Sequence, residues 1–93
     1  DRRFAESYVA DHRARSGSIK LTYELRQRGV PDTIIEAVIS DNRDSELVRA
    51  REIWRKKFDA APENAAETAR QMRFMQSRGF TSEVIRKTLS NPD

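Results

Sequence analysis

The sequence predicts an all-α fold: two tandem three-helix repeats, six helices in all, that form an elongated and curved helical array. Apolar residues recur at helical spacing along the chain, and no segment alternates apolar and polar residues as a half-buried strand would. Only three glycines and three prolines interrupt this pattern. The second half also repeats the spacing of the first half, which is typical of helical repeat proteins.

The first unit is expected to span residues 1–44. Its three helices are predicted over residues 2–15, residues 18–29 and a segment that starts at residue 31 or 32. Their apolar positions are Phe4, Ala5, Tyr8, Val9 and His12, then Ile19, Leu21 and Leu25, then Ile34, Ile35, Val38 and Ile39. We expect Gly17 to adopt the left-handed cap conformation, Ser18 to cap the second helix through its hydroxyl, and Gly29 to end that helix.

The second unit is expected to span residues 45–93, after a polar linker at residues 41–45. Its helices are predicted from Ser45 to Asp59, from residue 65 to a stop at Gly79, and after a cap at Thr81 or Ser82. Their apolar positions are Leu47, Ala50, Ile53, Trp54 and Phe58, then Ala65, Ala69, Met72 and Met75, then Val84, Ile85 and Leu89. Phe74 lies off the middle stripe, and we expect it to pack between helices of neighbouring units.

The two units align closely. A shift of 50 residues places Leu25–Val30 on Met75–Phe80, whereas the first helices align at a shift of 45 because the second unit has a longer loop. Each unit is too small to bury its apolar face alone, so stability should depend on the contact between them. At the free end of the first unit, Phe4 and Tyr8 are expected to leave apolar surface exposed.

The composition argues against an enzyme. The chain has no Cys and a single His, and it lacks a glycine-rich phosphate-binding loop, so we expect no metal and no cofactor. Asp41 and Asp44 are expected to solvate or cap the linker instead of acting as an acid and base pair. His12 is predicted at the edge of the core, and Trp54 inside it. No run approaches the roughly 20 apolar residues of a membrane helix, so no membrane partner is expected.

Three segments resemble the RecX family. Gly17–Val30 resembles the family's repeat signature, with Ser18 where the family often has Pro; Arg73–Phe80 looks like its last repeat, and Asp1–Val9 is similar to the opening of its middle repeat. The family has three tandem three-helix repeats, so the resemblance implies that residues 1–44 are the middle repeat and residues 45–93 the last.

The resemblance implies a cytoplasmic bacterial regulator without catalytic activity. Such a protein binds in the groove of the RecA filament on single-stranded DNA, and it inhibits ATPase and strand exchange in DNA repair and the SOS response. We expect this chain itself to be a monomer. The partners would be RecA and single-stranded DNA, contacted directly or through the filament. The alternative is a basic helical module that binds single- or double-stranded DNA directly.

Charge indicates where a partner would bind. Residues 1–44 hold eight basic and eight acidic residues, whereas residues 45–93 hold ten and seven, so the second unit carries the whole net charge of +3. The basic side chains are either a solvated face or a surface for phosphate or an acidic protein. The predicted contact residues are Lys20, Arg26, Arg55, Lys56, Arg70 and Arg73. Arg28 and Arg78 are instead expected to bond the last carbonyls of their own helices.

Overall fold

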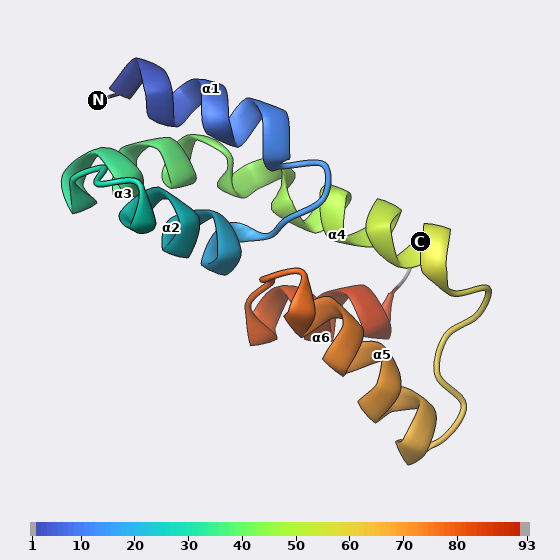
Figure 1. Ribbon diagram of the computed structural model, residues 1–93. Coiled ribbons are helices and arrows are strands. Elements are labelled where there is room, and N and C mark those ends of the chain that lie inside the picture. The colour runs from blue at the N-terminus through green and yellow to red at the C-terminus, as the bar shows by residue number, and fades with distance from the viewer. Residues whose placement is uncertain (1, 92–93) are drawn as a thin grey trace.

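The fold is an elongated array of six helices. The computed structural model describes residues 2–91 and measures 44 × 21 × 19 Å along its principal axes. The chain runs from α1 at one end to α5 at the other, and α4 leads from the first three helices toward the second end (Figure 1). The helices are α1 (Arg2–His12), α2 (Ser18–Gln27), α3 (Asp32–Asp41), α4 (Arg43–Lys57), α5 (Ala65–Ser77) and α6 (Ser82–Ser90).

The apolar residues form two separate cores. Residues of α1, α2 and α3 make the first core, around Val9, Leu21, Leu25 and Val38. Residues of α4, α5 and α6 make the second, around Trp54, Met75, Phe80 and Ile85. Each core is closed by three helices, as a three-helix repeat requires. The boundary predicted between residues 44 and 45 falls in the first turn of α4.

Both predicted glycine stops are confirmed. Gly29 follows α2 with a φ of 79°, and Gly79 follows α5 with a φ of 87°. These are left-handed conformations, which glycine adopts without a steric penalty from a side chain. The predicted cap of α6 is also confirmed, since the Thr81 hydroxyl accepts a hydrogen bond from the Val84 N–H at 3.2 Å.

The predictions around the first loop, residues 13–17 between α1 and α2, are wrong in three respects. The first helix ends at His12 and not at residue 15. Gly17 has a φ of −85°, so it is extended and not left-handed. The Ser18 hydroxyl does not cap α2; it donates a hydrogen bond to the Glu46 carboxylate at 3.0 Å. In each case the loop follows its contacts with the second unit instead of its local capping preference.

The predicted polar linker at residues 41–45 is also wrong. Asn42 alone separates α3 from α4, which starts at Arg43 and ends at Lys57. The turn is closed by side chains: Asn42 donates its amide to the Val38 carbonyl at 2.9 Å, and the Arg49 guanidinium donates to the Asn42 carbonyl at 3.1 Å. The backbone groups at two helix ends are thereby satisfied without a longer loop.

The buried face of α5 differs from the predicted stripe. Gln71 and Met75 are its buried residues, whereas Met72 is 36% exposed. The Trp54 indole N–H donates to the Gln71 side-chain oxygen at 2.8 Å, and the Gln71 amide donates to the Ala60 carbonyl at 3.2 Å. A buried indole N–H needs an acceptor, so α5 turns the glutamine inward in place of the methionine.

Phe74 is half-buried, and it packs against the core of its own unit, not between units as predicted. Its ring meets the Phe58 ring edge-on, with centroids 5.4 Å apart. This geometry is a favourable one for aromatic pairs. The half-buried ring joins the end of α4 to the last turn of α5, across the long loop between those helices.

At the free end of the first unit, Phe4 is 43% exposed, as expected, but Tyr8 is only 9% exposed. The Tyr8 hydroxyl donates to the Glu24 carboxylate at 2.9 Å, and the Arg28 guanidinium carbon lies 4.6 Å from the Tyr8 ring centroid. Burial raises the pKa of Tyr8, and the hydrogen bond to Glu24 acts in the same direction. The expected apolar surface is therefore confined to Phe4.

The junction between the two units is built from the backbone of the first loop. The Gly17 N–H donates to the Arg78 carbonyl at 2.7 Å, and the Ile19 N–H donates to the Gly79 carbonyl at 2.8 Å. A Cβ on Gly17 would lie 2.6 Å from a ring carbon of Phe80, and a Cβ on Gly79 would lie 2.6 Å from the backbone nitrogen of Lys20. The two backbones approach so closely that neither glycine position has room for a side chain.

Two buried charged residues of α4 hold the other side of this loop. One carboxylate oxygen of Glu46 accepts from both the backbone N–H of Ser18 (3.2 Å) and its hydroxyl (3.0 Å). The Arg49 guanidinium donates to the Arg13 carbonyl at 3.0 Å. Burial lowers the pKa of Arg49, and nearby Glu46 opposes this effect. The burial of Glu46 and Arg49 was not predicted from the sequence, because a charged side chain on a helix is normally solvated.

Candidate partner-binding surface

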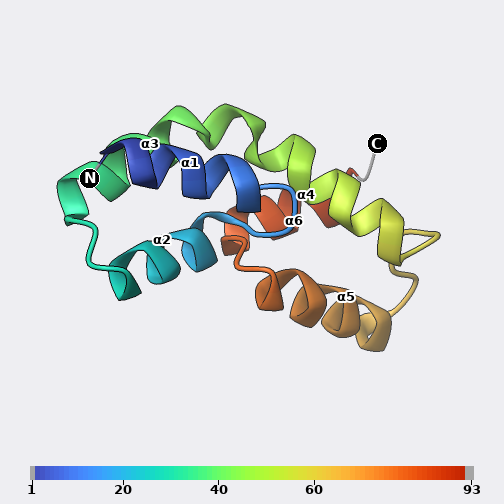
Figure 2. The same ribbon diagram turned by 45° about the horizontal axis from the view of Figure 1, so that its top comes forward.

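The six predicted contact residues come from three helices. α2 carries Lys20 and Arg26, α4 carries Arg55 and Lys56, and α5 carries Arg70 and Arg73. In Figure 2, α2 and α5 lie along one long edge of the molecule and α4 runs along the opposite edge. The six residues therefore do not form a single row. All are exposed except Lys20, which is half-buried beside the junction.

Some of these cations already have partners within the chain. Arg26 pairs with Asp32 at 3.0 Å. Arg70 pairs with Glu67 through two hydrogen bonds of 3.1 Å, and its guanidinium carbon lies 5.0 Å from the Phe58 ring centroid. The hydrogen bond from Arg70 lowers the pKa of Glu67, and the same bond raises the pKa of Arg70. A partner at either arginine would have to compete with the internal carboxylate.

Lys56 and Arg73 differ from those two arginines. Both are exposed, and neither forms an ion pair with a carboxylate in the described part of the chain. An anion could approach them without displacing an existing partner. Which of the six residues touch a partner stays a prediction.

The two arginines expected to cap their own helices behave differently. Arg28 donates to the Glu24 carbonyl of α2 at 3.3 Å, as predicted. Arg78 instead donates to the Arg15 carbonyl of the first unit at 3.5 Å, so the prediction for it is wrong. The reason is the junction, which places the turn after α5 against the loop between α1 and α2.

The other candidate side chains contact residues of the chain itself. The His12 ring is half-buried and stacks on the Tyr8 ring with centroids 3.9 Å apart, at the predicted edge of the core. Trp54 is 5% exposed, as expected of a core residue, and it cannot offer a face to a base. The Asp41 carboxylate forms an ion pair with the Arg2 guanidinium at 3.0 Å. Within residues 2–91, no three potential His, Asp or Glu ligands gather as a metal site.

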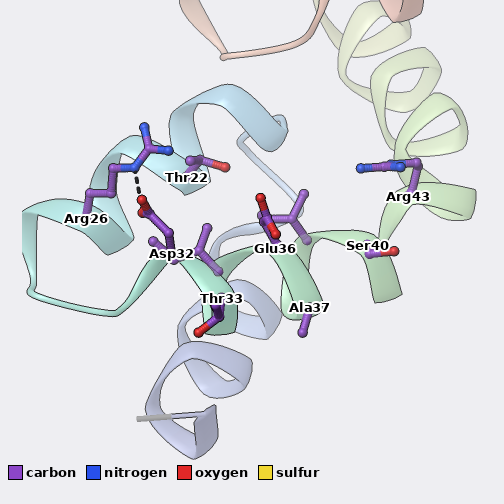
Figure 3. A pocket seen from close by; sticks show the side chains of 10 residues that line it. Thr22, Arg26, Asp32, Thr33, Glu36, Ala37, Ser40 and Arg43 are labelled. Carbon is purple, nitrogen blue, oxygen red and sulfur yellow. Dashed lines mark hydrogen bonds and ion pairs between the residues drawn. The ribbon is translucent and has the colours of Figure 1, made fainter.

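An open groove of about 640 Å³ lies between α2 and α3. Figure 3 shows Arg26 and Asp32 paired at one end, Glu36 in the middle, and Arg43 reaching toward the groove from the start of α4. The two basic and two acidic side chains balance each other. This groove therefore has no charge preference for an anionic partner.

The second unit has an equivalent groove of about 450 Å³ between α5 and α6. The shift of 50 residues relates the two: Met72 takes the place of Thr22, Arg86 that of Glu36, and Leu89 that of Ile39. Among residues 2–91, Arg86 is the one charged residue that lines it. The groove of the second unit therefore carries positive charge, from Arg86. The repeat pattern in the sequence was the signal that could have revealed these grooves.

Comparison with known proteins gives the same order of units. Residues 1–39 match the second three-helix domain of RecX, and residues 44–89 match its third three-helix domain. This chain belongs to the RecX family. The RecX domains fall on the two cores described above, so family and fold agree on the arrangement.

Relatives with the name regulatory protein RecX match almost the whole chain. The protein of Chromobacterium violaceum is 46% identical over 90 residues, which cover 97% of this chain and 58% of the relative. The protein of Leptothrix cholodnii is 40% identical and that of Ralstonia nicotianae 35%, each over 98% of this chain. The chain thus spans less than two thirds of these relatives. No solved structure matches it.

The name of these relatives describes them as regulatory proteins. Among helices of the described residues, none has the length and apolar character needed to cross a membrane.

Proposed function

We propose that this chain is the part of a cytoplasmic RecX regulator that binds the RecA filament on single-stranded DNA and inhibits its ATPase and strand exchange. It would act in this way as a monomer during DNA repair and the SOS response. The observation that carries the proposal is the match of both units, in order, to successive RecX domains.

The basic surface supports this proposal. The second unit holds the net positive charge of the chain, and within residues 2–91 its exposed Lys56 and Arg73 form no ion pair with a carboxylate, so they can meet an anionic surface. A RecA filament on DNA offers two such surfaces, acidic protein side chains and DNA phosphates. The fixed junction supports it too, because an array with one defined geometry loses less conformational entropy when it binds along a filament groove.

The first test is co-sedimentation with RecA filaments on single-stranded DNA, beside bare single-stranded DNA at the same salt concentration. The proposal expects binding to filaments well above binding to bare DNA. Equal or stronger binding to bare DNA would instead support a module that binds DNA directly. In that case the logarithm of the binding constant should fall with the logarithm of salt, by about 0.7 for each phosphate contacted on a single strand. Binding to neither would contradict both functions.

A charge-reversal pair tests the predicted surface. The variant with Arg70→Glu and Arg73→Glu should bind filaments at least about tenfold more weakly, because the two new carboxylates repel an anionic partner. The matched control is Arg86→Glu with Lys87→Glu on α6, which makes the same change in net charge outside the predicted contact residues. Thermal unfolding of both variants checks the fold. Equal losses of binding would show a general charge effect and contradict the choice of α5.

A further inference from the structure

A small crevice lies at the junction, where the first loop meets α4 and the end of α5. Its volume is about 260 Å³. We call it the junction crevice and define it by the residues that line it: Arg15, Ile53, Lys56, Lys57, Phe74 and Arg78, with Ala14 at its edge. Both units contribute to it, so it exists only when the junction is formed.

Four of these residues are cations, and no carboxylate of the described residues 2–91 lines the crevice. Arg15, Lys56 and Lys57 form no ion pair with a carboxylate anywhere in residues 2–91. Arg78 donates to a backbone carbonyl, which leaves its charge unneutralised. Like charges held close together repel, and an anion that enters between them removes this repulsion. The crevice is therefore a site for negative charge.

The floor of the crevice is apolar. Ile53 is buried, and Phe74 is half-buried. The Lys57 ammonium lies 5.6 Å from the Phe74 ring centroid, and the Arg78 guanidinium carbon lies 5.2 Å from it. These two cations lie close to the ring, and the Phe58 ring forms a T-shaped pair with it. Since the cations take up part of the ring, no whole aromatic face is left for a nucleobase to stack on, whereas a small aliphatic group needs only part of it and the Ile53 side chain.

An acidic protein segment satisfies both features. A short aliphatic side chain can rest on the apolar floor, while carboxylates on either side of it reach the cations at the rim. A DNA strand supplies phosphates but no aliphatic group for the floor. We propose that the junction crevice binds an acidic segment of a protein partner, with one aliphatic side chain seated between Ile53 and Phe74. This deepens the proposed function and rests on it for the identity of the partner as the RecA filament.

The test uses a defined probe, the peptide acetyl-Glu-Glu-Leu-Glu-Glu-amide, titrated into the isotopically labelled chain and followed by amide NMR shifts. The expected shifts are confined to residues of the crevice, with Arg15, Ile53 and Phe74 as reporters. The same peptide with Gly in place of Leu should bind more weakly, because it leaves the floor empty. An oligothymidylate of equal charge should not shift these reporters.

The variant with Arg15→Gln and Lys56→Gln should weaken peptide binding by at least about fivefold, because it removes two cations of the rim. The control is Arg86→Gln with Lys87→Gln on α6, which loses the same charge away from the crevice and should bind the peptide as the parent chain does. Neither Arg15 nor Lys56 is buried, so both variants should keep the thermal stability of the parent. Equal weakening by both variants, or oligothymidylate shifts at the same reporters, would overturn the proposal.

Filament co-sedimentation separates this proposal from the proposed function. If the Arg15→Gln and Lys56→Gln variant sediments with filaments as the parent chain does, the crevice is not the contact and the proposed function stands. If the parent chain itself fails to sediment with filaments, the proposed function fails, while the peptide titration still decides whether the crevice accepts an acidic segment.

Discussion

The turns after α2 and α5 have the same local structure but different surroundings. In both, Arg-Gly is followed by a buried apolar residue, and the glycine has a positive φ. The backbone around Gly29 is open, with no atom within 4 Å of a Cβ placed there. Gly79 instead touches the Lys20 backbone, and its carbonyl accepts the Ile19 N–H at 2.8 Å. Gly29 is therefore required only because of its left-handed backbone conformation. Gly79 is required for the same reason and also because a side chain there would collide with Lys20.

The largest expected effect separates these two requirements. Gly79→Ala should lower the free energy of unfolding by about 2–5 kcal/mol, from left-handed strain and collision with Lys20 together. Gly29→Ala should lose only the conformational part, roughly 1–2 kcal/mol. Urea unfolding, monitored by circular dichroism, measures the free energy of unfolding of both variants. Similar losses at the two glycines would show that the junction contributes little to stability.

Gly17→Ala isolates the requirement for space. Gly17 has an ordinary extended φ of −85°, so alanine brings no strain of its own. Its methyl group would still lie 2.6 Å from the Phe80 ring. We expect a loss of about 1–3 kcal/mol, the usual cost of overpacking. The same urea experiment applies, and a loss below that of Gly29→Ala would mean that the loop moves away from Phe80 at little cost.

Thr81→Ala tests the next difference between the turns. After Gly79, the Thr81 hydroxyl caps α6; after Gly29, Pro31 holds the N-cap position of α3 and offers no side-chain hydrogen bond. The loss of the cap should lower the free energy of unfolding by about 1 kcal/mol. Thr81→Ser keeps the hydroxyl and is the control. A thermal melt should show the alanine variant below both the parent and the serine variant.

The smallest expected effect is at the ion pair across the first turn. Arg26 and Asp32 have side chains 60% and 68% exposed, whereas the equivalent positions of the second turn, Gln76 and Ser82, are uncharged. Arg26→Ala should change the free energy of unfolding by no more than about 0.5 kcal/mol, because water and salt screen exposed pairs. A shift in the thermal melt that stays the same between low and high salt would contradict this screening.

The sequence predicted the parts of the fold that local chemistry decides. Helix stops at Gly29 and Gly79 follow from backbone freedom, and the cap at Thr81 follows from its hydroxyl. The inward face of α5 could not be read in this way, because Gln71 is buried only to pair with Trp54 from another helix. Glu46 was hidden for the same reason, since its partner is a loop backbone far away in the sequence.

The candidate surface was predicted less completely than the fold. The repeat pattern and the charge difference between the units pointed to the basic second half, and Lys56 was named from them. Arg15 and Lys57 were not, because the junction crevice depends on how the two units meet. The extended form of Gly17, which allows that contact, was itself mispredicted from local preference.

The hydrogen bonds of the first loop bear on how the chain is made. Arg15 and Arg78 are 63 residues apart, yet the loop that holds Arg15 is completed by the turn that holds Arg78. During synthesis, the first unit emerges from the ribosome with the N–H groups of Gly17 and Ile19 still bonded to water. They find their carbonyl partners only after the turn at Gly79 has also emerged. The loop between α1 and α2 therefore gains these two hydrogen bonds only once the second unit is present.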